Sequence, residues 1–221
     1  EGVSADDVIG GGCGLFTGFA AVDRSDLAMG DSVVVQGTGP VGLAAAAFAL
    51  LRGAGLVIAI GAPRSRLDLA RDLGADETLS IEDDSVEARA AVVRDLTGGR
   101  GADVIIEASG NPQAVVEGLD LLRDGGTYVV GGHYTDTGPI AINPHLHVNR
   151  KHADIRGQWG TEFRHIVRAL RVLARHRERL PLHRLIGARY GLEAAGRALE
   201  DVAALRVTKA VIDPSLGAEV S

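Results

Sequence analysis

Hydrophobic residues along the chain occur in short uninterrupted runs, separated by stretches in which they recur at helical spacing. A strand that is apolar at successive positions is typical of a parallel sheet, because both faces of such a sheet are covered. The runs predict strands at residues 33–35, 56–60, 77–81, 102–107, 126–131, 154–158 and 207–212. The intervening stretches predict one helix on each side of the glycine turn at 10–12, and further helices at residues 40–52, 64–73, 85–97, 111–122, 161–179 and 192–202. Residues 133–150 are rich in glycine and proline and are expected to form a loop.

The regular alternation of strand and helix predicts an α/β fold with right-handed crossovers between parallel strands. We expect a doubly wound sheet of six strands in the order 3-2-1-4-5-6, formed by residues 15–158.

A glycine-rich turn, Gly37-Thr38-Gly39-Pro40-Val41-Gly42, joins the first long strand to an alanine-rich helix. This G-x-G-x-x-G spacing between a strand and a helix is typical of dinucleotide-binding proteins. Gly37 permits the tight turn, Gly39 lets a pyrophosphate approach the backbone, and Gly42 allows close packing of helix on strand. Pro40 suits the first helical position, where no N–H is needed. The alternative is a glycine-rich turn that binds nothing.

The second strand of a dinucleotide-binding fold commonly ends in an acid that binds the adenosine ribose. Here that position is Gly61, and Arg64 and Arg66 follow it. An arginine can pair with a 2′-phosphate, which favours NADP over NAD by a small margin. In the alternative interpretation both arginines are solvated and NAD binds without the acid.

Composition makes several classes of protein less favoured. The net charge of −6 argues against a general nucleic-acid binder. No apolar run approaches the length of a membrane span, which is about 18 residues. The single cysteine suits a reducing compartment, so we expect a cytoplasmic protein. The chain begins at Glu1 rather than Met, and we expect it to be a piece of a longer protein.

Several motifs together resemble the zinc-dependent alcohol dehydrogenases of the medium-chain dehydrogenase/reductase superfamily. They extend over nearly the whole chain: Gly12-Cys-Gly-Leu-Phe-Thr-Gly-Phe-Ala-Ala-Val, Gly30 to Gly42, Ala70-Arg-Asp-Leu-Gly-Ala-Asp, Thr97-Gly-Gly-Arg-Gly-Ala-Asp-Val, Glu107-Ala-Ser-Gly and Gly125-Gly-Thr. The segment from Gly132 to His145 more loosely resembles members that act on bulky secondary alcohols such as hydroxycamphor. The resemblance implies hydride transfer between an alcohol, or the corresponding carbonyl compound, and NAD(P).

The resemblance also implies roles for single residues. Cys13 matches a ligand of the catalytic zinc, although a small buried cysteine is the ordinary state of a lone Cys. Thr17, a catalytic position, and Val41 match residues beside the nicotinamide, and Arg66 matches a basic residue beside the ribose. Gly131, Gly132 and His133 match backbone groups at the carboxamide, and Lys209 matches a pyrophosphate contact, with a surface lysine as its alternative. We further expect cofactor contacts at Thr38, Ser109, Gly110 and Gln158.

In the resembled family the other zinc ligands come from a GroES-like domain that precedes the nucleotide-binding fold. Cys13 cannot form a three-ligand site alone, so we expect zinc only in a full-length enzyme. Residues 1–14 and 159–221 would then be linker and C-terminal parts of that catalytic domain. The family also implies a homodimer or homotetramer that pairs the sheet edge at residues 153–157.

Other functions stay open at this point. A non-catalytic NAD(P)-binding sensor, a zinc-independent quinone-type reductase and a nucleoside-binding methyltransferase fit the same glycine turn. Nucleic-acid binding is conceivable on a basic helical face formed by Arg164, Arg168, Arg171 and Arg175. The opposite side of that helix is apolar, which favours an ordinary amphipathic helix.

Overall fold

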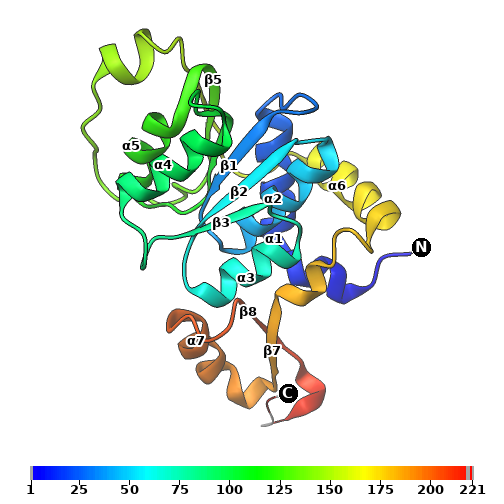
Figure 1. The fold of residues 1–221 in the computed structure, drawn as a ribbon. Helices are drawn as coiled ribbons and strands as arrows, with labels where there is room; N and C mark the ends of the chain where they lie inside the picture. Colours follow the sequence, from blue (N-terminus) through cyan, green and yellow to red (C-terminus); the bar gives the residue numbers. More distant parts are fainter. Residues whose placement is uncertain (1, 218–219, 221) are drawn as a thin grey trace.

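The computed structural model describes residues 2–217 and 220. Its centre is a six-stranded parallel sheet with the order β3-β2-β1-β4-β5-β6, as the sequence predicts (Figure 1). The strands are β1 (Ser32–Gln36), β2 (Leu56–Gly61), β3 (Glu77–Ser80), β4 (Ala102–Glu107), β5 (Leu122–Val130) and β6 (Asp154–Gly157). β1 and β4 are neighbours although two strands separate them in sequence. The chain therefore reverses direction across the sheet between β1 and β4, which is where doubly wound folds bind ligands.

Helices cover both faces of this sheet. Successive residues of β1 point to opposite sides, so that Val33 and Val35 join one core cluster and Val34 joins the other. The first cluster is shared with α1 (Ala5–Arg24), α2 (Pro40–Arg52), α3 (Arg64–Asp72) and α6 (Phe163–His176). The second is shared with α4 (Val86–Leu96) and α5 (Pro112–Leu121). This two-sided burial explains the unbroken apolar runs in the sequence.

Asp103 ties the start of β4 to the start of β1. Its Oδ2 accepts hydrogen bonds from the Ser32 backbone N–H at 2.8 Å and from Ser32 Oγ at 2.6 Å. Arg123 Nε donates to Asp103 Oδ1. Burial raises the pKa of Asp103, but these hydrogen bonds outweigh burial and hold the pKa below its usual value.

The two predicted N-terminal helices both form and meet at a kink within α1, where the backbone of Gly12 is not helical (φ 55°). The structure differs from the predicted elements at three places. β5 begins four residues earlier than predicted, at Leu122. The predicted loop contains a π-helix, η1 (Pro144–Asn149). A strand that the sequence did not predict, β7 (Ile186–Tyr190), pairs in parallel with β8 (Lys209–Ile212).

The C-terminal residues extend away from the main sheet at the bottom of Figure 1. They comprise β7, β8, the helix α7 (Ala195–Ala203) and two short 3-10 helices, η3 (Leu192–Ala194) and η4 (Pro214–Leu216). A further 3-10 helix, η2 (Leu182–Leu185), precedes them and packs against α1. The core of the sheet nevertheless continues past the predicted boundary at residue 158. Five fully buried residues after it belong to the cluster that contains Val33: Ala169, Leu173, Leu180, Leu182 and Leu185.

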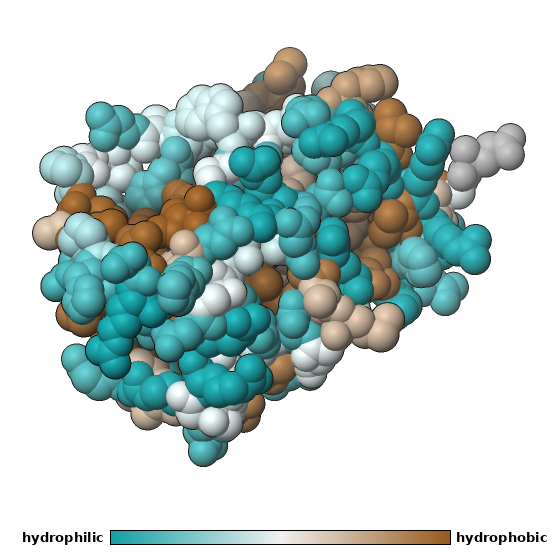
Figure 2. Space-filling model, turned by 90° about the horizontal axis from the view of Figure 1, so that it is seen from above, coloured by the Kyte–Doolittle hydropathy of each residue, from teal (hydrophilic) through white to brown (hydrophobic). Residues whose placement is uncertain are grey.

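Within the described part of the chain, no helix has the length and apolar character needed to cross a membrane. Figure 2 shows one face of the molecule, where separate apolar patches lie among hydrophilic side chains.

Candidate functional site

The glycine turn between β1 and α2 has the geometry that its sequence predicts. Gly37 has φ +108°, and a Cβ there would lie 2.8 Å from the Ala108 backbone. A Cβ on Gly42 would overlap the carbonyl oxygen of Gly37, so helix and turn are in direct contact. Gly39 is different, because a Cβ there would meet nothing within 4 Å. The open side of Gly39 is where a ligand can approach the backbone.

Gly39 is also the N-cap residue of α2, and no side chain caps this helix end. Pro40 occupies the first helical position, and the first turn carries no acidic residue. The N-terminus of a helix presents unpaired N–H groups and the positive end of the helix dipole. This end of α2 is therefore suited to bind a phosphate.

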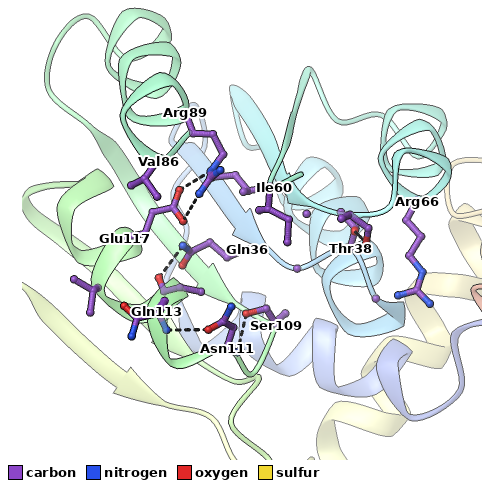
Figure 3. A pocket seen from close by; sticks show the side chains of 18 of the residues that line it. Gln36, Thr38, Ile60, Arg66, Val86, Arg89, Ser109, Asn111, Gln113 and Glu117 are labelled. Carbon is purple, nitrogen blue, oxygen red and sulfur yellow. Dashed lines mark hydrogen bonds and ion pairs between the residues drawn. The ribbon is translucent and has the colours of Figure 1, made fainter. Parts of the chain in front are cut away.

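A cavity of about 650 Å³ opens beside this turn, at the carboxyl ends of β1, β2 and β4 (Figure 3). It brings together six of the predicted cofactor-binding residues, which are Gly37, Thr38, Gly39, Gly61, Arg66 and Ser109. Their positions in the sequence span three separate loops. The predicted adenosine side of the site is thus one continuous cavity.

Thr38 fills the space beside Gly61. A Cβ on Gly61 would lie 2.7 Å from Thr38 Cγ2 and 3.0 Å from Thr38 Cβ, and it would overlap Thr38 Oγ1. Thr38 is 3% exposed, and its hydroxyl donates to the carbonyl of Ala62 at 3.1 Å. The side chain of Thr38 therefore occupies the space that an acidic side chain at position 61, the end of β2, would need.

The two arginines after β2 take different positions. Arg64 is exposed and pairs with Asp83 at 3.1 Å, outside the cavity. Arg66 lines the cavity, on the same side as Thr38 in Figure 3. Its Nε is buried without a hydrogen-bond partner, and burial lowers the pKa of its guanidinium. An anion bound in the cavity would relieve this cost, so Arg66 is the better candidate for a 2′-phosphate contact.

The residues that form the far wall of the cavity were not predicted from the sequence. Arg89 on α4 donates to Glu117 on α5 at 2.7 Å and 3.0 Å, and this ion pair is almost fully buried (Figure 3). Gln36 Nε2 donates to the carbonyl of Ala114. Ile81 and Val86 add apolar surface. The wall combines apolar and polar groups in the way that a nucleobase pocket does, and no spacing in the sequence signals a pair that is 28 residues apart.

A second group of predicted residues lies after β4, β5 and β6. The backbone N–H groups of Gly131 and Gly132 both donate to the carbonyl of Glu107, at 2.9 Å and 3.0 Å. A Cβ on Gly110 would lie 2.8 Å from the Gly132 carbonyl oxygen. Gln158 lies beside Gly131 and donates its backbone N–H to Val130 at 2.8 Å. The structure thus brings these predicted residues together at the carboxyl edge, outside the cavity lining.

α1 carries the predicted residues Cys13 and Thr17 and packs against the glycine turn. A Cβ on Gly14 would lie 2.7 Å from the carbonyl carbon of Pro40 and 2.9 Å from the N atom of Val41, so α1 contacts the first turn of α2. Half-buried Thr17 follows on the same helix. The Nζ atom of Lys209 lies against Gly12, where α1 bends. Lys209 therefore contacts α1 two residues before Gly14, which is the position that meets the first turn of α2.

The described residues do not fit a metal centre. Cys13 is exposed, and residues 2–217 and 220 contain no group of three or more His, Cys, Asp or Glu side chains placed to hold a metal ion. A catalytic zinc requires three protein ligands and an open position. These residues alone do not supply that set.

Comparisons with known proteins agree on one family. The family model for zinc-binding dehydrogenases matches residues 40–175. The 5-exo-hydroxycamphor dehydrogenase of Pseudomonas putida is 40% identical over 206 residues, which are 93% of this chain and 57% of that protein. The crystal structure of an alcohol dehydrogenase from Thermotoga maritima superposes with a TM-score of 0.87 at 35% identity, over 95% of this chain and 58% of that one.

A zinc-binding dehydrogenase of Sinorhizobium meliloti, solved bound to NADP, has a TM-score of 0.76 at 28% identity, over 85% of this chain and 54% of that one. The chain therefore spans less than two thirds of the length of these relatives.

Proposed function

Because the chain belongs to the zinc-binding dehydrogenase family, we propose that it is the dinucleotide-binding part of an NAD(P)-dependent alcohol dehydrogenase. The observation that carries the proposal is the glycine turn. Gly39 leaves the N-terminus of α2 open toward a cavity of about 650 Å³ at the point where the sheet reverses its strand order. The reaction is hydride transfer between a secondary alcohol and the nicotinamide ring.

In this proposal the dinucleotide lies across the carboxyl edge of the sheet. The pyrophosphate meets the backbone at Gly37–Gly42 and the side chain of Lys209. The adenosine lies in the cavity between Arg66 and the Arg89–Glu117 wall, where Arg66 binds a 2′-phosphate. The nicotinamide lies beside Thr17 and Val41, and its carboxamide meets Gly131, Gly132 and His133.

The buried Nε of Arg66 supports NADP, and the NADP-bound relative agrees with it. Residue 61 is a glycine, so there is no carboxylate at this position that would repel a 2′-phosphate. We therefore rank NADP above NAD for this chain. The similarity to a hydroxycamphor dehydrogenase supports a bulky secondary alcohol as the substrate class.

Zinc enters the proposal only for the whole enzyme. Cys13 would be one ligand, and the other ligands would come from outside these 221 residues. Bound there, zinc would act as a Lewis acid that stabilises the alkoxide of the substrate. The domain division follows the same proposal, with residues 15–158 binding the dinucleotide and residues 1–14 and 159–221 belonging to the catalytic part.

We also propose that two subunits pair through β6, which forms the edge of the sheet. An unpaired edge strand exposes backbone N–H and C=O groups to a partner. Ile155 on this strand is 42% exposed, although it is a large apolar residue. The single cysteine supports a reducing compartment, for which we propose the cytoplasm.

The test is a fluorescence titration of the purified chain with NADPH and NADH. We expect saturable binding that Gly39→Val abolishes, because the branched side chain would occupy the approach of the pyrophosphate. The fold of this variant should survive, since a Cβ at Gly39 has free space. Gly196→Val is the matched control, because a Cβ there also meets nothing within 4 Å but lies on α7, away from the cavity. Failure of the wild-type chain to bind either dinucleotide would refute the proposal.

A further inference from the structure

Glu107 is a carboxylate with no exposed surface at the end of β4. Its two oxygens accept four hydrogen bonds from neighbouring loops. Three of these bonds go to Oε1 and one goes to Oε2. A buried carboxylate with this many partners fixes the geometry of whatever donates to it.

The two oxygens of Glu107 serve different loops. Oε1 accepts from the backbone N–H of Ser109 at 2.7 Å, from Ser109 Oγ at 2.8 Å and from the backbone N–H of Gly110 at 2.7 Å. Oε2 accepts from the backbone N–H of Gly132 at 3.0 Å. One side chain therefore joins the loop after β4, which borders the adenosine cavity, to the residue after β5, which lies outside it.

His133 contacts the same oxygen from the side of the β5 loop. Its buried Nε2 has no hydrogen-bond partner and lies 3.8 Å from Glu107 Oε2. Its Nδ1 lies 3.3 Å from Thr137 Oγ1. Among the described residues, His133 is the one basic side chain within 4.0 Å of the Glu107 carboxylate. A single carboxylate oxygen, Oε2, thus faces both the backbone N–H of Gly132 and the ring of His133.

We propose that Glu107 is a positioning residue for the nicotinamide half of the dinucleotide. Through Oε2 it holds Gly132 and His133 in the arrangement that receives this half. This role rests on the proposed function, because it requires the dinucleotide to cross the carboxyl edge of the sheet. Glu107 itself lies beneath the loops and contacts the cofactor only through them.

The substitution Glu107→Gln affects the hydrogen bonds of the two loops differently. The amide oxygen can keep the three donors of Ser109 and Gly110, because an amide oxygen also accepts hydrogen bonds. The amide NH₂ then takes the place of Oε2 and faces the Gly132 N–H, so that two donors oppose each other. The loop after β4 stays in place. The loop after β5 keeps the bonds from Gly131 and Gly132 to the backbone carbonyl of residue 107 but loses its side-chain acceptor, so Gly132 and His133 shift.

The experiment compares two ligands on each variant. One is the reduced dinucleotide that the wild-type chain binds more tightly, and the other is the corresponding ADP-ribose, which lacks the nicotinamide. For Glu107→Gln we expect the dissociation constant of the dinucleotide to rise about tenfold and that of the ADP-ribose to change by less than about twofold. Gln113→Ala is the control, because Gln113 lines the cavity and its replacement affects both ligands by the same factor.

Equal loss for both ligands in Glu107→Gln, or no loss for either, would overturn the role assigned to Glu107. Failure of the wild-type chain to bind the ADP-ribose would instead refute the proposed function, so the two failures can be told apart. Circular dichroism checks that Glu107→Gln folds. If it does not, Glu107→Asp takes its place, because it keeps the charge but is one methylene too short to reach both loops. Its carboxylate should stay with the three donors of Ser109 and Gly110 and lose the single donor of Gly132, so the same unequal loss is expected, and an equal loss contradicts the proposal.

Discussion

The space beside Gly61 allows a sharp test of how this chain selects its cofactor. The sequence suggests that Gly61→Asp would restore the ribose-binding acid and shift preference toward NAD. The structure adds a condition, because a side chain at Gly61 collides with buried Thr38. We therefore expect Gly61→Asp to be destabilising alone and effective only when Thr38 is made smaller.

The cost of the single change follows from these contacts. Overpacking against Thr38 costs about 1–3 kcal/mol, and displacing the Thr38 hydroxyl from the Ala62 carbonyl costs about 0.5–1.5 kcal/mol. Gly61→Asp alone should thus lose about 2–4 kcal/mol of unfolding free energy. Thr38→Ala removes two of the three contacting atoms and leaves the one at 3.0 Å. In that background the cost of Gly61→Asp should fall by about 1–3 kcal/mol, as coupling between touching residues predicts.

The effect on the cofactor is electrostatic. A carboxylate about 5 Å from a 2′-phosphate repels each unit of charge by about 3 kcal/mol at an effective dielectric constant of 20. The double variant should therefore bind NADPH at least about 100-fold more weakly relative to NADH than the wild-type chain does, which is the effect of a single unit of phosphate charge. Thr38→Ala alone carries no new charge and should leave this ratio unchanged.

The assay is a four-member cycle of wild type, the two single variants and the double variant. Urea unfolding gives the free energies, and titration gives the dissociation constants of NADPH and NADH. If Gly61→Asp alone were as stable as the wild type, Thr38 would not obstruct that position. If the double variant kept the wild-type ratio of dissociation constants, Gly61 would not lie at the ribose.

Three further predictions follow from other parts of the molecule. The chain should form dimers in light scattering, and Ile155→Pro on the edge strand β6 should give monomers; a monomeric wild type would contradict edge pairing. Elemental analysis should find less than one equivalent of zinc, because Cys13 has no companion ligands among the described residues. If the chain held one equivalent of zinc and Cys13→Ala removed it, the chain would complete its own zinc site. Asp103→Asn should cost about 2 kcal/mol at pH 7, since it weakens the bonds from Ser32 and Arg123. Because the pKa of Asp103 is depressed in the folded state, this cost should shrink as the pH falls below about 4. An equal cost at pH 3 and pH 7 in urea unfolding would contradict it.

The sequence by itself determined the sheet, its strand order and the phosphate turn. These features depend on local or periodic signals. Burial of both sheet faces produces unbroken apolar runs, and the glycine spacing is a local motif at the junction of a strand and a helix. The resemblance to a known family added further site residues, among them Thr17, His133 and Lys209, whose roles stay predictions.

Only the tertiary structure decided what surrounds that turn. β7 has no apolar run to reveal it, and α6 enters the core because its buried residues meet α1 and the sheet across long distances in sequence. The decisive contacts join residues from different loops or helices: Thr38 with Gly61, Arg89 with Glu117, and Glu107 with Gly132. Such pairs leave no periodic trace in the sequence, because they form only after parallel strands have brought their carboxyl ends to one edge.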